Sequence, residues 1–321
     1  MSAPFQDLRE AIDRHIEAVV DSCPYPASLY DPIRYVMRVG GKRVRPLLVL
    51  LSARSLGAAE GSILDLAAAV ELLHTFTLVH DDIMDRDDMR RGHPTIHARW
   101  DEGTAILAGD ALIGLAYRCL SRQDGQRMGE MIRTFTDAVV EVCEGQALDK
   151  EFEGRLDVTL GDYEDMIARK TGRLISMSAR IGALAGDGDE GQVAALEHFG
   201  ACLGKAFQIQ DDLLDYFSST EELGKAVGSD LAMRKVTYST LKGRELLTGP
   251  AARRLEEVLQ GGAAGVGEIR PLLLAGGVPE AGRRDVEQLA AQARAALAEV
   301  LPPEHRIELE RYAQWILHRT H

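Results

Sequence analysis

Two aspartate triplets of identical spacing are the residues of this chain most suited to chemistry. They are Asp81-Asp82-x-x-Asp85 and Asp211-Asp212-x-x-Asp215, and each lies inside an otherwise apolar run. At about 100° per residue, the first and last members of each triplet lie on one helix face, a turn apart. Carboxylates this close repel one another unless cations lie among them. Mg²⁺ prefers a few carboxylates together with water and phosphate oxygens. One triplet alone would be explained as well by a solvated helix face, but two predict metal binding.

Basic side chains flank the triplets although the chain as a whole is acidic. It carries 37 Lys and Arg against 50 Asp and Glu, a net charge of −13, which argues against a nucleic-acid-binding protein. Arginine offers forked contacts to phosphate and lysine a point charge. We therefore expect diphosphate binding by the cations near the triplets: Lys42, Arg45, Arg90, Arg91, Lys170, Lys225 and Lys235.

Metal ions, a diphosphate and an apolar helical tunnel together favour ionisation chemistry. Metal ions neutralise the charge that builds on a departing diphosphate. The carbocation left behind must be kept from water in a dry cavity. A carbon nucleophile could then be held through a second, metal-free diphosphate site made of Lys and Arg.

The elements that must position these residues are helices. The chain is 45% hydrophobic but only 5% aromatic, and apolar residues recur at helical spacing. The pattern predicts helices over about 5–20, 29–39, 46–57, 62–87, 103–121, 126–153, 159–186, 190–218, 235–247, 251–260, 267–275, 280–301 and 304–319. No strand pattern of useful length and no long linker appears, so we expect one all-α domain, a helical bundle spanning residues 1–321.

The remaining sequence features favour a cytoplasmic protein. Cys23, Cys119, Cys143 and Cys202 show no metal-ligand or disulfide spacing and are expected to be reduced. The N-terminus is charged almost at once and has no apolar signal core. No uncharged apolar run of about 18 residues is present, so no transmembrane segment is expected.

Five motifs occur in the order and spacing of a known enzyme family. They are Gly40-Gly41-Lys42-Arg43-x-Arg45-Pro46, His74, Asp81-Asp82-x-x-Asp85 with Arg90-Arg91-Gly92, Lys170-Thr171-Gly172, and Phe207-Gln208-x-Gln210-Asp211-Asp212-x-x-Asp215. They cover roughly residues 35–240. With them the chain resembles the trans-isoprenyl diphosphate synthase (polyprenyl synthetase) family.

The resemblance implies the all-α isoprenoid-synthase fold in a single polyprenyl synthetase domain, usually as a homodimer. It implies head-to-tail condensation of isopentenyl diphosphate with an allylic diphosphate, and three Mg²⁺ ions for which Mn²⁺ can substitute. Metal ligands would be Asp81, Asp82, Asp85 and Asp211, with Asp212 and Asp215 acting directly or through water. The allylic diphosphate would be held by Arg90, Lys170, Lys225 and Lys235, with Thr171 and Gln208 near the reacting carbons. Isopentenyl diphosphate would be held by Lys42, Arg45, His74 and Arg91.

Two residues after the second triplet depart from the family pattern GKxxGxDxxxGKxTxP. Arg234 stands where the family commonly has glycine, and Ser239 stands where it has proline. Because Lys235 lies between these two residues, the departures could change the position of its side chain relative to the family pattern.

Phe76 and Thr77, just upstream of the first triplet, are candidates for setting product length. They lie five and four residues before Asp81, and Phe76 is large enough to block a growing prenyl tail, although it could also be an ordinary core aromatic. The chain has an aromatic residue five positions before Asp81, a small residue four positions before it, and no insertion in the triplet. In these respects it resembles the archaeal-type geranylgeranyl diphosphate synthases. A C20 product is expected, with C15 and C25 or longer as alternatives.

Two other functions share parts of this pattern. A terpene cyclase would carry the first triplet but more often has an Asn/Ser/Glu-type second metal motif and does not need the Gly-Gly-Lys-Arg segment. A non-catalytic subunit of a heteromeric synthase usually lacks one or both triplets. This chain has both triplets intact and carries the Gly-Gly-Lys-Arg segment, which favours the prenyltransferase.

Overall fold

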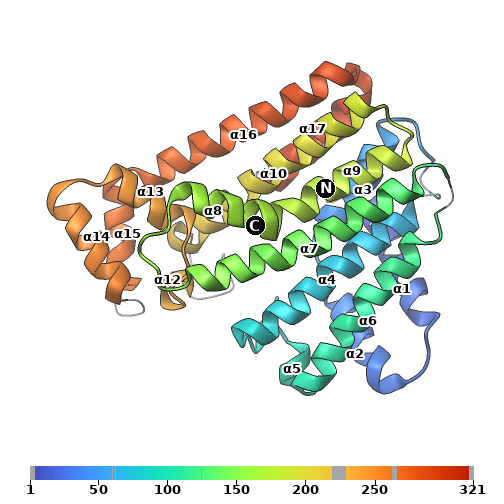
Figure 1. Ribbon diagram of the computed structural model, residues 1–321, viewed down its shortest axis with the longest axis horizontal. Helices are drawn as coiled ribbons and strands as arrows, with labels where there is room; N and C mark the ends of the chain where they lie inside the picture. Colours follow the sequence, from blue (N-terminus) through green and yellow to red (C-terminus); the bar gives the residue numbers. More distant parts are fainter. Residues whose placement is uncertain are drawn as a thin grey trace. The chain divides into compact units, whose positions relative to one another are not determined.

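The structure is a computed structural model, and it describes residues 4–59, 61, 63–123, 125–218, 229–261 and 266–317. Most of these residues are helical, which confirms the all-α prediction (Figure 1). The chain forms two compact units. Unit 1 comprises Met1–Thr136, Met177–Glu197 and Val300–Tyr312, and unit 2 comprises Asp137–Ser176, His198–Glu299 and Ala313–His321. The expected single domain stays a prediction.

Unit 1 is built around α4 (Leu64–Asp85), which packs along α6 (Glu102–Leu120) and α3 (Val44–Arg54) (Figure 1). Both α3 and the first half of α4 are apolar on nearly all sides, so they are buried where amphipathic helices would face water. The unit's other elements are α1 (Gln6–Asp21), α2 (Ala27–Val39), β1 (Met89–Arg90), β2 (His93–Pro94) and α5 (Ile96–Arg99), with parts of α7 (Met128–Phe152), α9 (Arg173–Ala185), α10 (Glu190–Phe217) and α17 (Pro303–Leu317).

Helix α6 is, in the part of the chain that the structure describes, the one helix long and apolar enough to cross a membrane by length and composition. The core helix of a globular protein meets the same criteria. About half of its apolar stretch, 44%, is buried within the protein, with α4 as its main neighbour. Its buried face packs in the core of unit 1.

Unit 2 holds two apolar clusters. The first gathers Tyr163, Met166, Ile209 and Tyr238 and the second Tyr216, Leu255 and Leu273, among others. The elements that contribute residues to unit 2, some only in part, are α7, α8 (Leu160–Ile167), the π-turn η2 (Ala168–Gly172), α9 (Arg173–Ala185), α10 (Glu190–Phe217), α12 (Ser229–Ala232), α13 (Tyr238–Leu246), α14 (Gly249–Gly261), α15 (Val266–Ala275), α16 (Val278–Val300) and α17 (Pro303–Leu317).

Three local features differ from the sequence-based expectation. The helix expected to open at Pro46 begins at Val44, because Arg43 takes a left-handed conformation and ends the preceding loop. The helix expected over 159–186 is interrupted by η2. A pair of two-residue antiparallel strands, β1 and β2, was not predicted, since so short a hairpin has no alternating pattern.

Candidate active site

The first aspartate triplet forms the C-terminal turn of α4. Asp85 is the last helical residue, and Arg86 closes the helix in the left-handed conformation. Asp82 is buried, while Asp81 and Asp85 are half-buried on the neighbouring face, as the helical spacing predicts. Burial raises the pKa of Asp82 to about 6, although the Arg90 guanidinium opposes the rise. A helix C-terminus carries partial negative charge, so the whole turn favours a cation.

Arg90 and Arg91 are presented by the hairpin that follows this turn. Arg91 and Gly92 both have positive φ between the paired strands, as a two-residue primed turn requires. Arg90 Nε donates to Asp82 Oδ1 at 2.6 Å. Arg91 donates to the carbonyl of Gly40. The hairpin thus directs one guanidinium to the first triplet and the other to the Gly-Gly loop.

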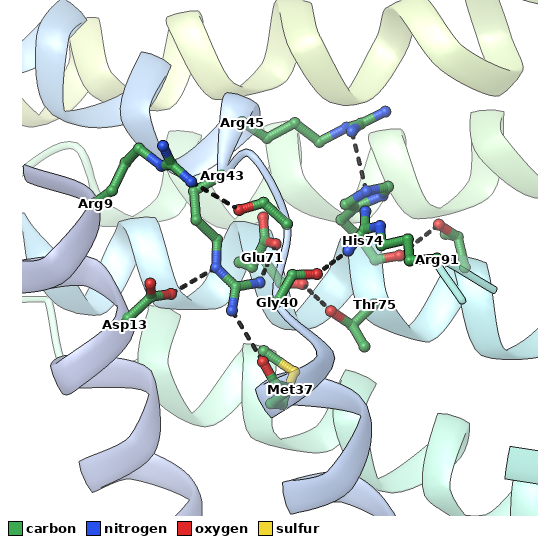
Figure 2. A network of polar contacts seen from close by, with 12 residues as sticks. Arg9, Asp13, Met37, Gly40, Arg43, Arg45, Glu71, His74, Thr75 and Arg91 are labelled. Carbon is green, nitrogen blue, oxygen red and sulfur yellow. Dashed lines mark hydrogen bonds and ion pairs between the residues drawn. The ribbon is translucent and has the colours of Figure 1, made fainter. Parts of the chain in front are cut away.

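His74 lies two turns before the first triplet and contacts Arg45, with Nη1 to Nε2 at 3.1 Å (Figure 2). Because a guanidinium can only donate, Nε2 accepts and the imidazole proton is on Nδ1. Nδ1 has no hydrogen-bond partner within the described residues. Burial, followed by the positive charges of Arg45 and Arg91, holds the pKa of His74 well below its ordinary value. The structure therefore brings Arg45, His74 and Arg91 together, whereas Lys42 is exposed at the loop.

The predicted Lys170-Thr171 pair lies on the π-turn η2 of unit 2. Thr171 donates to Gln208 Oε1 at 2.8 Å, and Lys170 Nζ to Asp149 Oδ2 at 2.5 Å. Two glycines allow the turn to pack this closely. A Cβ on Gly145 would overlap the Lys170 backbone, and one on Gly204 would lie 2.7 Å from the Gly172 Cα. π-turns recur at functional sites, and this one places both predicted side chains.

Asp212 of the second triplet points into the interior of unit 2. Its carboxylate accepts from Tyr163 at 2.7 Å, Gln208 at 2.9 Å and the Tyr238 backbone N–H at 2.7 Å. Burial and the charge of Asp230 raise its pKa to about 7, against these hydrogen bonds. Both oxygens are engaged by the protein, so the geometry favours a supporting role for Asp212. Asp211 is half-buried, and buried Asp215 accepts from the Asp230 N–H at 3.3 Å.

A polar cavity of about 130 Å³ collects the predicted allylic-site residues of unit 2. Lys170, Thr171, Gln208, Asp212 and Lys235 line it, and Asp149 and Asp230 add two further carboxylates. The sequence had placed these residues on separate segments, and the fold brings them to one cavity. Lys225 lies outside the described residues.

Arg234, the departure from the family's glycine, has a left-handed φ of 57°. The backbone N–H of Arg234 donates to the Leu231 carbonyl at 2.9 Å. The backbone N–H of Lys235 donates to the Asp230 carbonyl, also at 2.9 Å. These two bonds form a Schellman motif at the end of α12, whose left-handed residue is usually glycine. Arg234 therefore forms the same turn that glycine would form, and Lys235, the next residue, lines the cavity. Ser239, at the family's proline position, donates to the Asp212 carbonyl at 3.0 Å.

Phe76 is half-buried and packs edge-on against His80, with ring centroids 4.7 Å apart. His80 in turn contacts the Ile106 carbonyl at 3.3 Å and faces Gly109 of α6. Thr77 donates to the His74 carbonyl at 2.8 Å. His80 thus lies against α6 and supports the ring of Phe76.

Comparison with known proteins explains why these motifs occur together. Residues 26–273 match the pattern of the polyprenyl synthetase family. The chain belongs to that family. It is 45% identical over 238 residues to the short chain isoprenyl diphosphate synthase of Methanothermobacter thermautotrophicus, covering 74% of this chain and 73% of that protein. It is 37% identical over both full lengths to the geranylgeranyl pyrophosphate synthase of Geoglobus acetivorans. A crystal structure of a geranylgeranyl pyrophosphate synthase superposes over both full chains with a TM-score of 0.92 at 35% identity.

As a polyprenyl synthetase, the protein is a trans-prenyltransferase of the prenyl diphosphate synthase type. The family uses divalent metal ions. Among the described residues, no group of three or more His, Cys, Asp or Glu side chains lies close enough together to hold a metal ion. The donor chemistry nevertheless fits a hard divalent cation. Asp81, Asp82 and Asp85 offer carboxylate oxygens at a helix C-terminus, and Mg²⁺ commonly takes its other ligands from water and phosphate.

Sequence reasoning about this polyprenyl synthetase left several residues of the site without an assigned role. Asp149 pairs with Lys170, while Tyr163 and Tyr238 both donate to carboxylates. Asp149 sits three residues after Gln146 on α7, so a buried acid in an amphipathic helix was the available signal. Tyr163 follows the Thr159 capping box, which fixes the start of α8 and hence the direction of its side chain.

Proposed function

We propose that this protein condenses isopentenyl diphosphate head-to-tail with an allylic diphosphate to give all-trans geranylgeranyl diphosphate (C20). One observation carries the proposal furthest. A single helix, α4, holds a carboxylate triplet at its C-terminal turn and, two turns earlier, an imidazole surrounded by guanidinium groups. The carboxylate triplet suits a leaving group that is bound through metal ions. The imidazole among guanidinium groups suits an anion that is bound without metal.

Mg²⁺ is the proposed metal, as three ions per site, with Mn²⁺ able to substitute. We assign its binding to Asp81, Asp82, Asp85 and Asp211, with Asp212 and Asp215 acting directly or through water. When bound, Mg²⁺ neutralises the charge that develops on the departing diphosphate. The hydrogen bonds that engage Asp212 favour a role in which it orients Gln208 and its neighbours.

The proposed allylic diphosphate site uses four basic side chains. Lys170 and Lys235, which line the polar cavity, would contact the diphosphate, together with Arg90 and Lys225. Thr171 and Gln208, hydrogen-bonded to each other, would lie near the reacting carbons. Their mutual bond fixes the orientation of the amide, whose oxygen, the negative end of its dipole, would stabilise the developing positive charge.

The proposed isopentenyl diphosphate site uses Lys42, Arg45, His74 and Arg91. Neutral His74 would donate from Nδ1, while Arg45 and Arg91 supply the forked charge-assisted contacts. The released diphosphate is the base to which we assign removal of the final proton, because no side chain is needed for that step. The apolar surroundings of α4 would exclude water from the cation.

Phe76, with Thr77 beside it, is the proposed floor of the prenyl tunnel. The edge-on packing of His80 holds the ring in place, which supports a stop at C20. C15 and C25 or longer are the alternative products.

We further propose a cytoplasmic homodimer in which residues 1–321 work as one polyprenyl synthetase domain. The family match crosses both compact units, which supports the single domain. Exposed apolar side chains on α6 and the start of α7 support a partner: Ile106 is 42%, Leu107 61% and Ile132 39% exposed.

The test is incorporation of labelled isopentenyl diphosphate into a longer prenyl diphosphate with geranyl diphosphate as starter. We expect product with Mg²⁺, none with a chelator, and a loss of at least about a hundredfold in kcat for Asp81→Ala. Release of diphosphate from the allylic substrate alone, with a hydrocarbon product, would point to a cyclase. No product from a folded wild type would point to a non-catalytic subunit.

A further inference from the structure

Arg43 stands in the middle of the basic motif, yet its side chain is turned into the protein. It is 6% exposed, whereas Lys42 before it is exposed and Arg45 after it is half-buried. Its guanidinium uses all three nitrogens: Nε donates to Asp13 at 2.7 Å, Nη1 to Glu71 at 2.6 Å and Nη2 to the Met37 carbonyl at 3.0 Å (Figure 2). One side chain thus joins α1, α2 and α4 to the loop.

Glu71, the central partner, is a buried carboxylate only 3% exposed. Burying a charge is strongly unfavourable unless the charge is paired and hydrogen-bonded. Although burial opposes the charge of Arg43, the carboxylates of Glu71 and Asp13 raise the Arg43 pKa. Glu71 lies one turn before His74 on the same helix. The ion pair therefore ties the loop to the helix that carries His74.

The backbone of the loop is held at neighbouring points. Arg9 Nη2 donates to the Gly41 carbonyl at 3.4 Å, and Arg91 donates to the Gly40 carbonyl. Arg43 itself takes a left-handed φ of 51° and accepts the first helical bond of α3 from Leu47 at 3.1 Å. This conformation is strained for a residue other than glycine. Its contacts are what hold it there, and the turn directs Lys42 outward and Arg45 toward His74.

We propose that Arg43, locked by Glu71 and Asp13, is a positioning residue that sets the geometry of Lys42 and Arg45 for the diphosphate of isopentenyl diphosphate. The inference rests on the function proposed above for Lys42, Arg45 and His74. Arg43 does not touch the substrate. Its role is to fix, before binding, a loop that would otherwise have to be ordered by the ligand.

The test compares Glu71→Gln, Asp13→Asn and Arg43→Lys with the wild type. Glu71→Gln and Asp13→Asn keep side-chain size, and Arg43→Lys keeps the charge, but each weakens the contacts that hold Arg43. We expect KM for isopentenyl diphosphate to rise about tenfold for Glu71→Gln. A smaller rise is expected for Asp13→Asn, whose carboxylate is half-exposed. KM for the allylic diphosphate should change by less than about twofold.

Glu197→Gln is the matched control, because it weakens a similar Arg180 network in the same unit. Arg180 pairs with Glu197 at 2.5 Å and Glu130 at 2.7 Å. This variant should lower Tm without changing KM for isopentenyl diphosphate. Should Glu71→Gln fail to fold, the double variant Arg43→Met/Glu71→Leu replaces the pair with apolar groups, a change that often leaves stability intact. It should show the same KM increase.

Calorimetric titration of isopentenyl diphosphate separates this proposal from the proposed function. A wild type that binds isopentenyl diphosphate but forms no product would refute the condensation, and a tenfold weaker affinity in Glu71→Gln would still support positioning. If folded Glu71→Gln and the double variant both kept the wild-type affinity and KM for isopentenyl diphosphate, the positioning role of Arg43 would be overturned. Equal rises in both substrates' KM would overturn it as well, since they would reflect general loosening. A wild type without measurable affinity for isopentenyl diphosphate would refute both.

Discussion

At the scale of single residues, burial decides which groups of this site carry charge. His74 and Asp82 lie on the same helix only two turns apart, and burial shifts the pKa of each toward its neutral form. Arg90 partly restores the negative charge of Asp82, while Arg45 and Arg91 reinforce the neutrality of His74. A neutral imidazole with its proton on Nδ1 can donate a hydrogen bond to an anion, while the neighbouring guanidinium groups supply the positive charge.

Neutral His74 predicts a specific pH dependence of stability. Its folded pKa lies well below the ordinary 6.5, so below that pH the unfolded chain binds a proton that the folded protein does not. The free energy of unfolding should fall as pH drops below 6.5, by up to about 1.4 kcal/mol per unit from this group. Urea unfolding of metal-free wild type and His74→Gln at about pH 7, 6 and 5 measures it. We expect a shallower fall in the variant. Parallel profiles would contradict a depressed pKa, because the other histidines contribute equally to both proteins.

At the scale of elements, the site depends on helix ends and on one break in a helix. The first triplet ends α4, Lys235 follows the Schellman turn of α12, and Lys170 and Thr171 lie on the π-turn η2. These are positions where backbone groups lack regular helical partners. The reactive side chains are therefore presented by irregular backbone held between packed helices.

Arg234 at the Schellman turn offers a stabilising substitution. Its left-handed backbone costs a non-glycine residue about 1 kcal/mol, so Arg234→Gly should raise the free energy of unfolding by about that amount. Arg234→Ala, which removes the guanidinium but keeps Cβ, should stay near the wild type. Urea unfolding of the three proteins compares them. Equal stabilisation by alanine and glycine would place the effect in the side chain and contradict the backbone explanation.

The regular elements were predictable from sequence and the irregular ones were not. The helices bearing both triplets followed from apolar spacing, and so did the shared faces of Asp81 with Asp85 and Asp211 with Asp215. The π-turn was missed because it depends on Gly145 and Gly204, which are distant in sequence from Lys170. The Arg43–Glu71 pair was missed for the same reason, since 28 residues separate its members. Spacing predicts which face a residue occupies but not which distant side chain it meets.

At the scale of the whole molecule, an apolar surface on α6 supports the homodimer proposed above. Leu107 is the most exposed of its apolar residues at 61%, and an uncovered patch of this kind marks interaction surfaces. Leu107→Glu should convert the expected dimer to monomer in sedimentation velocity. Ile307→Glu, at an apolar α17 residue that is 51% exposed, is the matched control and should stay dimeric. A wild type that sediments as a monomer would contradict the assignment.

The most direct measurement of the central claim is product sizing. Purified protein, Mg²⁺ and isopentenyl diphosphate are incubated separately with dimethylallyl, geranyl and farnesyl diphosphate, and the dephosphorylated alcohols are sized by mass spectrometry. We predict a dominant C20 alcohol from every starter and longer products from Phe76→Ala. A C15 product, or one of C25 and longer, would keep the condensation and contradict the assignment of Phe76 as the floor. No elongation of any starter by the folded protein would contradict the condensation itself.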